Sequence, residues 1–219
     1  MTTTCPEYLM NGLYLWYFNV KGMAWEVKQM ELLKQRIIEE GVVVSDQVLK
    51  LDGLLNHQVD PELTMMMGKE FASLFAESGV TRIVTVESSG IAVAFATAFA
   101  MGVPLVFARR KKTLLADPDA YCERVPSFTK GIVTDIMLSR EYINSEDRVL
   151  FIDDIIANGD AARGLIKIIE RSGAELVGVG IVVEKCFQAG ARTIREQGIK
   201  LESLARIQSL ENGTITFAE

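Results

Sequence analysis

The stretch from Val149 to Ala162 constrains the fold of this 219-residue chain more than any other. An apolar run, residues 149–152, passes into two consecutive aspartates, a turn of small residues and a helical pattern over about residues 159–171. A short apolar run before such a turn is typical of a buried strand that a crossover helix follows. In sheets of this kind, ligands bind where strands end and helices begin. The stretch therefore predicts an α/β fold with a site at this turn.

Strand-like and helix-like segments alternate along the rest of the chain. Helices are expected around residues 30–37, over the alanine-rich residues 91–101 and, after an Asp-Pro start, over residues 60–78. Strands are expected at residues 82–86, 105–108, 176–183 and 200–204. Residues 127–134 and 136–142 have no helix between them and are expected to be exposed strands of a hairpin or flexible flap. The alternation indicates an α/β domain around a mostly parallel sheet flanked by helices.

Composition argues against several classes of protein. A formal net charge of -6 is unlike the basic surface of a nucleic-acid binder. Three widely spaced cysteines, Cys5, Cys122 and Cys186, suggest a reducing cytosol rather than a disulfide framework. The single histidine, His57, has no Cys or His at ligand spacing, so no structural zinc site is expected. Apolar residues 9–20 are fewer than the roughly 20 that span a bilayer and follow no basic segment, so neither a membrane anchor nor a secretory signal is expected.

The N-terminal residues 1–29 are treated as an extension, and the main domain is expected to cover residues 30–219. Trp25-Glu26-Val27 can be encoded by TGG-GAG-GTN, which contains the ribosome-binding sequence GGAGG shortly before the codon of Met30. One hypothesis is that Met30 is the true start and that residues 1–29 are only the translation of leader sequence that lies before it. The alternative is an extra N-terminal helix packed on the domain. A peptide covering residues 7–21, found in the protein made from its own gene, would exclude the first hypothesis.

The acid doublet and the turn after it suit a phosphorylated sugar. Asp153 and Asp154 can accept hydrogen bonds from two neighbouring ribose hydroxyls. Small residues leave room for backbone N–H groups to surround a phosphate at the start of the helix: Ala157, Asn158, Gly159 and Ala161. The alternative is two acids that simply cap a helix. Because successive strand residues face opposite ways, both acids serve one site only if the strand ends before them; otherwise one of them holds the loop.

This strand, acid pair and loop resemble the phosphoribosyl-pyrophosphate (PRPP) signature of type I phosphoribosyltransferases. The loop departs from that pattern, with Asn158 and Ala161 where threonine is common and with Asp160 placing a carboxylate beside the expected 5-phosphate. From Met30 onward, the order of several other runs is similar to that of bacterial xanthine phosphoribosyltransferases. These runs are residues 39–43 (EEGVV), 45–50 (SDQVLK), 55–58 (LNHQ), 87–92 (ESSGIA), 152–159 (IDDIIANG), 183–185 (VEK) and 203–210 (SLARIQSL).

The resemblance implies a reaction in which xanthine and PRPP give xanthosine monophosphate and pyrophosphate. It implies a type I phosphoribosyltransferase fold with a small hood and a flexible hairpin flap, PRPP binding by residues 157–161, and a homodimeric, cytoplasmic enzyme. Mg²⁺ would be held mainly by PRPP, without direct protein ligands. Family positions assign xanthine contacts to Leu49, Asn56 and Lys185, and the Lys185 ammonium would donate to an exocyclic oxygen. Phe187 would either stack on the purine or pack in the core.

Two further segments are expected to hold the leaving pyrophosphate. The first stands between a strand and the alanine-rich helix, where backbone N–H groups and hydroxyls bind anions or only cap the helix: Glu87, Ser88, Ser89 and Gly90. The second is the basic run of residues 109–112, which begins with Arg109 just past a strand. Such a run is often only a solvated surface, but beside pyrophosphate at least one of its cations would act as a clamp.

Two rival functions stay open from the sequence. A phosphoribosyltransferase for adenine, hypoxanthine-guanine or orotate would share the PRPP site and differ around Leu49, Asn56 and Lys185. A PRPP-binding regulator without catalysis would ordinarily need a DNA-binding module, and residues 1–40 are too short and insufficiently basic to supply one. A panel of substrates separates these possibilities, whereas the fold does not.

Overall fold

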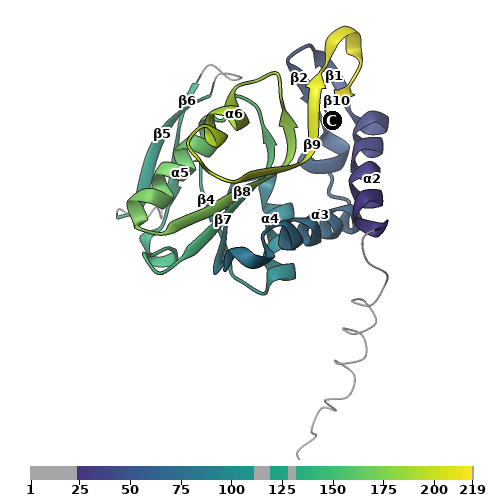
Figure 1. Cartoon of the computed structure of the whole chain (residues 1–219). Helices are drawn as coiled ribbons and strands as arrows, with labels where there is room; N and C mark the ends of the chain where they lie inside the picture. Colours follow the sequence, from purple (N-terminus) through teal and green to yellow (C-terminus); the bar gives the residue numbers. More distant parts are fainter. Residues whose placement is uncertain (1–23, 111–118, 128–131, 219) are drawn as a thin grey trace, which may run out of the picture.

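The computed structural model describes residues 24–110, 119–127 and 132–218. Within these residues, the centre of the molecule is a six-stranded sheet in the order β10-β9-β8-β7-β3-β4 (Figure 1). Neighbouring strands are parallel except that β10 pairs antiparallel with β9. The strands are β3 (Arg82–Val86), β4 (Leu105–Ala108), β7 (Arg148–Ile156), β8 (Glu175–Lys185), β9 (Leu201–Ser209) and β10 (Thr216–Phe217). The predicted mostly parallel α/β sheet is confirmed.

β3 and β4 have the predicted bounds, but β7, β8 and β9 are longer than predicted. β7 continues past the acid pair to Ile156 instead of ending at Ile152. Its last residues stay paired with β8, since Asp153 lies opposite Ile181 and Ile155 lies opposite Val183. Backbone pairing with β8 therefore extends β7 through Asp153 and Asp154, although the apolar run that predicted the strand ends before them.

Helices cover both faces of the sheet (Figure 1). One face carries α2 (Ala24–Glu40), α3 (Pro61–Leu74) and α4 (Gly90–Met101), and the other carries α5 (Asp160–Ser172) and α6 (Gly190–Arg195). The expected helix over residues 60–78 ends as an α-helix at Leu74, and a separate 3-10 turn, η2 (Ala76–Ser78), follows it. None of the helices in the described ranges combines the length and apolar composition needed to cross a bilayer.

Apolar side chains form one layer on each face of the sheet. Phe71 of α3 and Ile152 of β7 belong to the layer under α3 and α4, whereas Phe151 of β7 and Leu165 of α5 belong to the layer under α5. Gly180 of β8 makes room for Phe71, because a β-carbon at that position would lie 2.8 Å from the ring. The two layers fix the central strands, and with them the positions of the strand ends that form the site.

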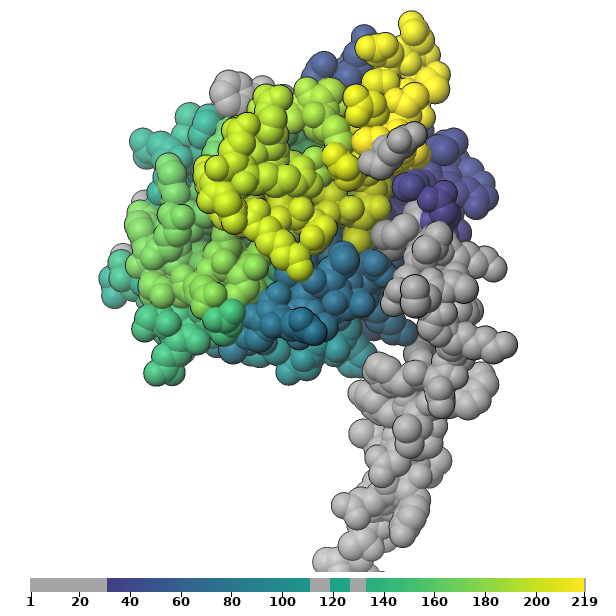
Figure 2. Space-filling view, in the orientation of Figure 1, coloured from purple at the N-terminus to yellow at the C-terminus, as the bar shows by residue number. Residues whose placement is uncertain are grey.

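A small hood lies beside the β9–β10 edge of the sheet. It consists of the antiparallel hairpin β1 (Val42–Ser45) and β2 (Val48–Lys50) and the π-helix η1 (Asp52–Asn56), next to the 3-10 turn η4 (Glu211–Gly213). Figure 2 shows the yellow C-terminal segment against the blue and purple atoms of the hood and α2. The hood strands escaped prediction because β1 is exposed on most of its length and lacks a buried alternating face.

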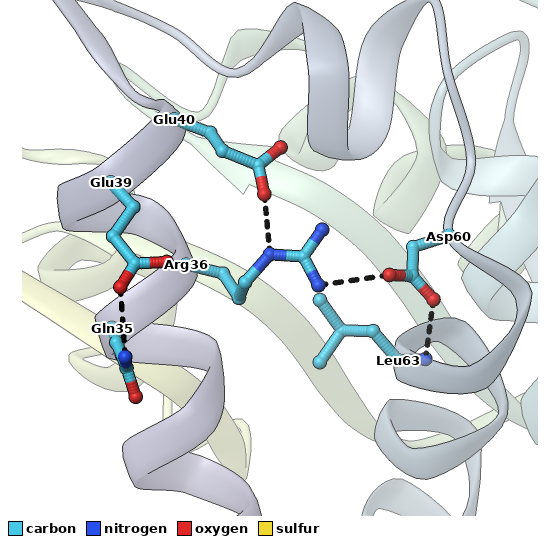
Figure 3. Close-up of polar contacts among 6 residues, drawn as sticks. All are labelled: Gln35, Arg36, Glu39, Glu40, Asp60 and Leu63. Carbon is cyan, nitrogen blue, oxygen red and sulfur yellow. Dashed lines mark hydrogen bonds and ion pairs between the residues drawn. The ribbon is translucent and has the colours of Figure 1, made fainter.

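Arg36 fastens α2 to α3. Its guanidinium pairs with Glu40 in α2 and, at 2.9 Å, with Asp60, the residue that caps α3 (Figure 3). Asp60 also accepts a hydrogen bond from the Leu63 N–H at 3.0 Å. The Leu63 N–H and then Arg36 lower the pKa of the Asp60 carboxyl below its ordinary value. This network joins the helix that precedes the hood to the helix that follows it.

The predicted hairpin is present, but its bounds were wrong. It consists of β5 (Tyr121–Ser127) and β6 (Ile132–Leu138), and a 3-10 turn, η3 (Arg140–Tyr142), follows it. One side of the hairpin is buried on α5, where Glu123 pairs with Lys167 at 3.2 Å and with Arg171 at 3.6 Å. The strands are therefore not exposed on both faces, because Val125, Ile136 and Leu138 belong to the α5 layer. Flexibility of the flap stays a prediction.

Some expectations fall on residues outside the described ranges. They concern residues 1–23 of the proposed leader, residues 111 and 112 of the basic run, and residues 128–131 between β5 and β6. The expected boundary at residue 30 falls inside α2, and the division of the chain at that point stays a prediction.

Candidate active site

One pocket brings together several of the site residues expected from the sequence. Asp153, the loop after β7 and Lys185 all line it. The lining residues from β7 through α5 are Asp153, Ile155, Ile156, Ala157, Asn158, Gly159, Asp160, Ala161 and Ala162. Those from elsewhere are Gln47, Arg110, Val125, Pro126, Thr134, Ile181, Lys185 and Gln188. The pocket thus joins the hood, the hairpin and the carboxyl ends of β7 and β8, which is where ligands bind in sheets of this type.

The acid pair lies inside β7, so the two aspartates differ in position. Asp153 lines the pocket, whereas Asp154 does not, although each residue is only 9% exposed. This follows from the alternation of side chains along a strand that continues through both residues. The Asp154 N–H donates to Asp153 Oδ1 at 3.1 Å. Asp153 therefore faces the pocket directly, and the Asp154 N–H holds its side chain from the next position.

The pKa of Asp153 is raised well above its ordinary value. Burial is the largest cause, followed by the charge of Asp154 and a side-chain hydrogen bond between the two carboxyl groups. The Asp154 N–H and the charge of Arg110 oppose the shift without cancelling it. Asp153 therefore keeps its proton to a higher pH than an exposed aspartate does.

The turn between β7 and α5 has a backbone shape that can bind an anion, and we call it the anion seat (residues 157–161). Gly159 has a positive φ of 78° and occupies the N-cap of α5 without a side chain to accept from the first N–H groups. The loop rests on Gly190, the first residue of α6, whose N–H donates to Ala157 O at 3.0 Å. A β-carbon on Gly190 would lie 2.4 Å from Ala157 O and 2.6 Å from Gly159 N. Only glycine at position 190 fits the observed path of this loop.

Asp160 is the one acid among residues 157–161, and its side chain is paired. Its Oδ1 accepts from Arg163 Nη2 at 2.5 Å, and the Asp160 side chain is 14% exposed. An unpaired carboxylate at this position would oppose a phosphate in the loop. The ion pair with Arg163, one turn along α5, reduces this repulsion.

In the segment expected to bind pyrophosphate, the Glu87 side chain contacts the basic run. The Glu87 carboxylate accepts from the Arg110 N–H at 2.7 Å and pairs with Arg109 Nε at 2.8 Å. Arg109 is tied to β6 by a backbone bridge to Met137, and its side chain is 52% exposed. Ser88 is exposed and Ser89 is half-buried. Of the two members of the basic run within the described ranges, Arg110 lines the pocket and Arg109 does not.

Gly90 brings the start of α4 against the acid pair. A β-carbon there would lie 2.5 Å from both Asp153 Oδ1 and Thr85 Oγ1. Thr85 is fully buried at the end of β3, and its hydroxyl has no hydrogen-bond partner among the described residues. The N-terminus of α4, with its partial positive charge, therefore lies directly beside the Asp153 carboxyl group.

The residues expected to bind the base are only partly brought together. Lys185, at the end of β8, is 8% exposed, and its Nζ donates to Gln47 O at 2.9 Å in the β1–β2 turn. Burial lowers the pKa of Lys185 below its ordinary value. Leu49 is buried in the hood and Asn56 is exposed at the end of η1, and neither lines the pocket. Phe187 is half-buried against the apolar layer that contains Leu49.

Sequence reasoning missed the two glutamines of this pocket. Gln188 Nε2 donates to Gln47 Oε1 at 3.1 Å, and Gln188 Oε1 is buried without a hydrogen-bond partner among the described residues. The two residues lie 141 positions apart in the chain, so no local pattern links them. The signal available was proximity to named sites, since Gln47 stands two residues before Leu49 and Gln188 three residues after Lys185.

Comparison with known proteins gives the family. No protein-family model matches the chain. The chain is 54% identical over 188 residues to xanthine phosphoribosyltransferase from Moorella thermoacetica, covering 86% of this chain and 96% of that protein. It is 52% identical over 190 residues to xanthine phosphoribosyltransferase from Bacillus mycoides, covering 87% and 96%.

Solved structures agree on the fold. The adenine phosphoribosyltransferase of Rhodothermus marinus matches with a TM-score of 0.68 and 25% identity over 83% of this chain and 99% of that one. The Saccharomyces cerevisiae enzyme, solved with adenine and an imino-altritol bisphosphate, matches with a TM-score of 0.66 and 22% identity over 81% and 99%. With a type I phosphoribosyltransferase fold and relatives more than half identical over most of its length, the chain belongs to the xanthine phosphoribosyltransferase family.

Proposed function

We propose that this protein transfers the phosphoribosyl group of PRPP to xanthine, giving xanthosine 5'-monophosphate and pyrophosphate in purine salvage. The observation that carries the proposal is the single pocket in which Asp153, the 157–161 loop and Lys185 meet. These parts match three chemical groups of the substrates: a ribose, a phosphate and a purine base. The identity with xanthine phosphoribosyltransferases supports the same substrate.

In this proposal, the loop and the acid pair hold the ribose 5-phosphate portion of PRPP. The N–H groups at the start of α5 bind the 5-phosphate, helped by the partial positive charge of the helix N-terminus. The Asp153 carboxyl group accepts from a ribose hydroxyl, and Asp154 supports it. Asp153 gives up its proton to solvent when the ribose hydroxyls bind, and the resulting carboxylate stabilises the positive charge that develops on the ribose as pyrophosphate leaves.

The bond from the ribose anomeric carbon to the pyrophosphate oxygen breaks, and a bond from that carbon to a xanthine ring nitrogen forms. The departing oxygen takes the electron pair, so cations and N–H donors around pyrophosphate lower the barrier. Arg110 supplies one such cation at the pocket. Because Arg109 and Arg110 occupy the Glu87 carboxylate, Glu87 shapes the segment, while Ser88, Ser89 and Gly90 offer hydroxyls and N–H groups to the anion.

Magnesium is proposed to enter with PRPP. The described residues contain no group of three or more His, Cys, Asp or Glu able to hold a metal by itself, whereas Asp153 offers the oxygen donor that Mg²⁺ prefers. When bound, Mg²⁺ would neutralise pyrophosphate charge, with most of its ligands coming from PRPP oxygens and water.

Lys185 is proposed to select the base. Its ammonium group is a donor without acceptor capacity, so it pairs with the exocyclic oxygen of xanthine and opposes the amino group that adenine carries at the corresponding carbon. A nearby cation also favours the anionic form of xanthine, which then needs no separate general base. Asn56 and Leu49 are proposed to complete the base pocket from the hood, and Phe187 to stack on the purine.

Steady-state turnover of xanthine, guanine, hypoxanthine and adenine with PRPP and Mg²⁺ tests the proposal. Preference for xanthine supports both the reaction and the role of Lys185. Preference for another base keeps the PRPP site and discards the base assignment. Tight PRPP binding without turnover of any of the four bases would instead favour a regulator.

We also propose a homodimer that works in the cytoplasm. Phe95 and Phe99 of α4 are 58% and 56% exposed, and their rings stack with centroids 6.4 Å apart. Large apolar side chains exposed side by side favour a contact between two copies. A cytoplasmic location fits a co-substrate whose phosphate charges keep it from crossing a bilayer.

A further inference from the structure

Arg163 makes contacts behind the 157–161 loop that no step described so far uses. Its guanidinium reaches back from α5: Nη2 donates to Asp160 Oδ1 at 2.5 Å, and Nη1 donates to Asn158 O at 2.7 Å and to Thr193 Oγ1 at 3.4 Å. The Arg163 side chain is 34% exposed, so its guanidinium is partly withdrawn from solvent and contacts these partners instead. Asn158, Arg163 and Thr193 also line a separate hollow with Ala189, on the side of the loop that α6 covers.

The contact with Asp160 reduces the repulsion that this carboxylate would exert on a phosphate bound in the same loop. Asp160 is the first residue of α5 and belongs to the same five-residue loop as the anion seat. An unpaired carboxylate a few ångströms from a doubly charged phosphate would repel it strongly in a partly desolvated pocket. Arg163 removes most of that repulsion, because its cation is in direct contact with the acid.

The contact with Asn158 acts on the backbone of the same loop. A carbonyl oxygen that points into an anion seat repels the anion as a carboxylate does, although more weakly. Arg163 Nη1 holds the Asn158 oxygen by a short hydrogen bond, and Thr193 Oγ1 of α6 accepts a longer one from the same nitrogen. One side chain therefore keeps two negative groups of the loop paired with a cation.

We propose that Arg163 is a positioning residue for PRPP: it neutralises Asp160 and holds the Asn158 carbonyl, so that a loop containing an acid can receive the 5-phosphate. The inference rests on the proposed binding of PRPP at this loop. It predicts that most of the effect of Arg163 on PRPP affinity depends on the negative charge of residue 160, with the Asn158 carbonyl accounting for the smaller remainder.

A double-mutant cycle tests this dependence. The parental enzyme, R163Q, D160N and R163Q/D160N are compared by KM for PRPP, KM for xanthine and kcat, with thermal unfolding to check the fold. In the parental background, R163Q is expected to raise KM for PRPP about tenfold, with kcat and KM for xanthine changed by less than about threefold. In the D160N background, the same substitution is expected to change KM for PRPP by less than about threefold.

R192Q is the matched control, because it also removes one cation beside this region. Arg192 of α6 is 73% exposed and lies 3.9 Å from Glu196, its partner just past the end of the same helix. R192Q is expected to leave all three kinetic parameters unchanged, which excludes a simple loss of net charge as the cause.

An equal rise in KM for PRPP in both backgrounds would overturn the inference, because a purely structural role of Arg163 does not depend on the charge at residue 160. If the parental enzyme turns over none of the four bases, the proposed function fails instead. Calorimetry of ribose 5-phosphate binding to the same four proteins then gives the cycle directly, and equal losses in both backgrounds again refute the role of Arg163.

Discussion

Gly190 offers the sharpest test of how the fold positions the loop that is proposed to bind the 5-phosphate. It begins α6 and has no positive φ, so alanine fits its backbone conformation without strain. The obstacle is the loop itself: the added carbon would lie 2.4 Å from Ala157 O, 2.6 Å from Gly159 N and 2.9 Å from the Asn158 carbonyl carbon. All three are backbone atoms, which cannot rotate aside as a flexible side chain can. G190A therefore acts on the loop before it acts on anything else.

The size of the effect follows from the closest contact. Carbon and oxygen atoms approach to no less than about 3.3 Å even in weak hydrogen bonds. The contact of 2.4 Å therefore requires the loop and α6 to separate by about 1 Å, which also stretches the hydrogen bond from the Gly190 N–H to Ala157 O. A misplacement of about 1 Å near a reacting group costs up to about 100-fold in rate. We expect kcat/KM for PRPP to fall between about 10-fold and 100-fold, with a loss of stability of about 1–3 kcal/mol.

Gly198 supplies a control just past the other end of the same helix. It has a φ of 79°, and a β-carbon added there would meet no atom of the described residues within 4 Å, so G198A strains the backbone without touching the loop. That strain costs about 1–2 kcal/mol, similar to the expected loss in G190A. Both variants are compared by thermal unfolding and by initial rates over a range of PRPP at saturating xanthine. Similar unfolding temperatures with a PRPP defect in G190A alone are the expected result.

Two results would refute this reasoning. An unchanged kcat/KM for PRPP in a folded G190A protein would mean that the loop accommodates the methyl group without moving the phosphate seat. An equal PRPP defect in G198A would mean that general destabilisation of α6 causes the loss.

Three further predictions concern the base, the acid pair and the dimer. K185M should lower kcat/KM for xanthine about 10-fold to 100-fold, because a hydrogen bond from a charged group is lost. KM for PRPP should change less than about threefold. A loss confined to PRPP would contradict the base assignment. D153N should abolish turnover yet raise the unfolding temperature. Because the pKa of Asp153 is raised in the folded state, the parental protein loses stability as pH rises above the ordinary value of 3.8. The stability advantage of D153N should therefore grow from about pH 4 toward neutrality. A difference in unfolding temperature that stays constant across this range would count against the raised pKa. Replacing Phe95 and Phe99 together by glutamate should give monomers in sedimentation velocity, and a species of unchanged mass would place the dimer contact elsewhere.

The local parts of the fold could be predicted from the sequence, because their causes are local. Asp60 followed by proline predicted the start of α3, and the structure shows Asp60 accepting from the Leu63 N–H. The acid doublet, the small-residue turn and Gly159 predicted the loop before α5, where the structure has the positive φ that glycine allows. What failed was the end of β7. Pairing with β8, a strand about 30 residues further on, holds both acids in the strand, and an apolar run contains no information about that partner.

The parts of the site that sequence reasoning missed share one property: each depends on a contact between elements far apart in the chain. The hydrogen bond from Lys185 Nζ to Gln47 O spans 138 residues. Within the basic run, Arg109 and Arg110 are chemically equivalent, and their sequence neighbours give no reason to prefer one. The choice is made by Glu87, which draws Arg109 into an ion pair, and by Met137 of β6, which fixes the Arg109 backbone. Of these two arginines, Arg110 lines the pocket together with Asp153. A run of like charges thus predicts that a cation reaches the site, but only the packing of β3, β4 and β6 decides which one.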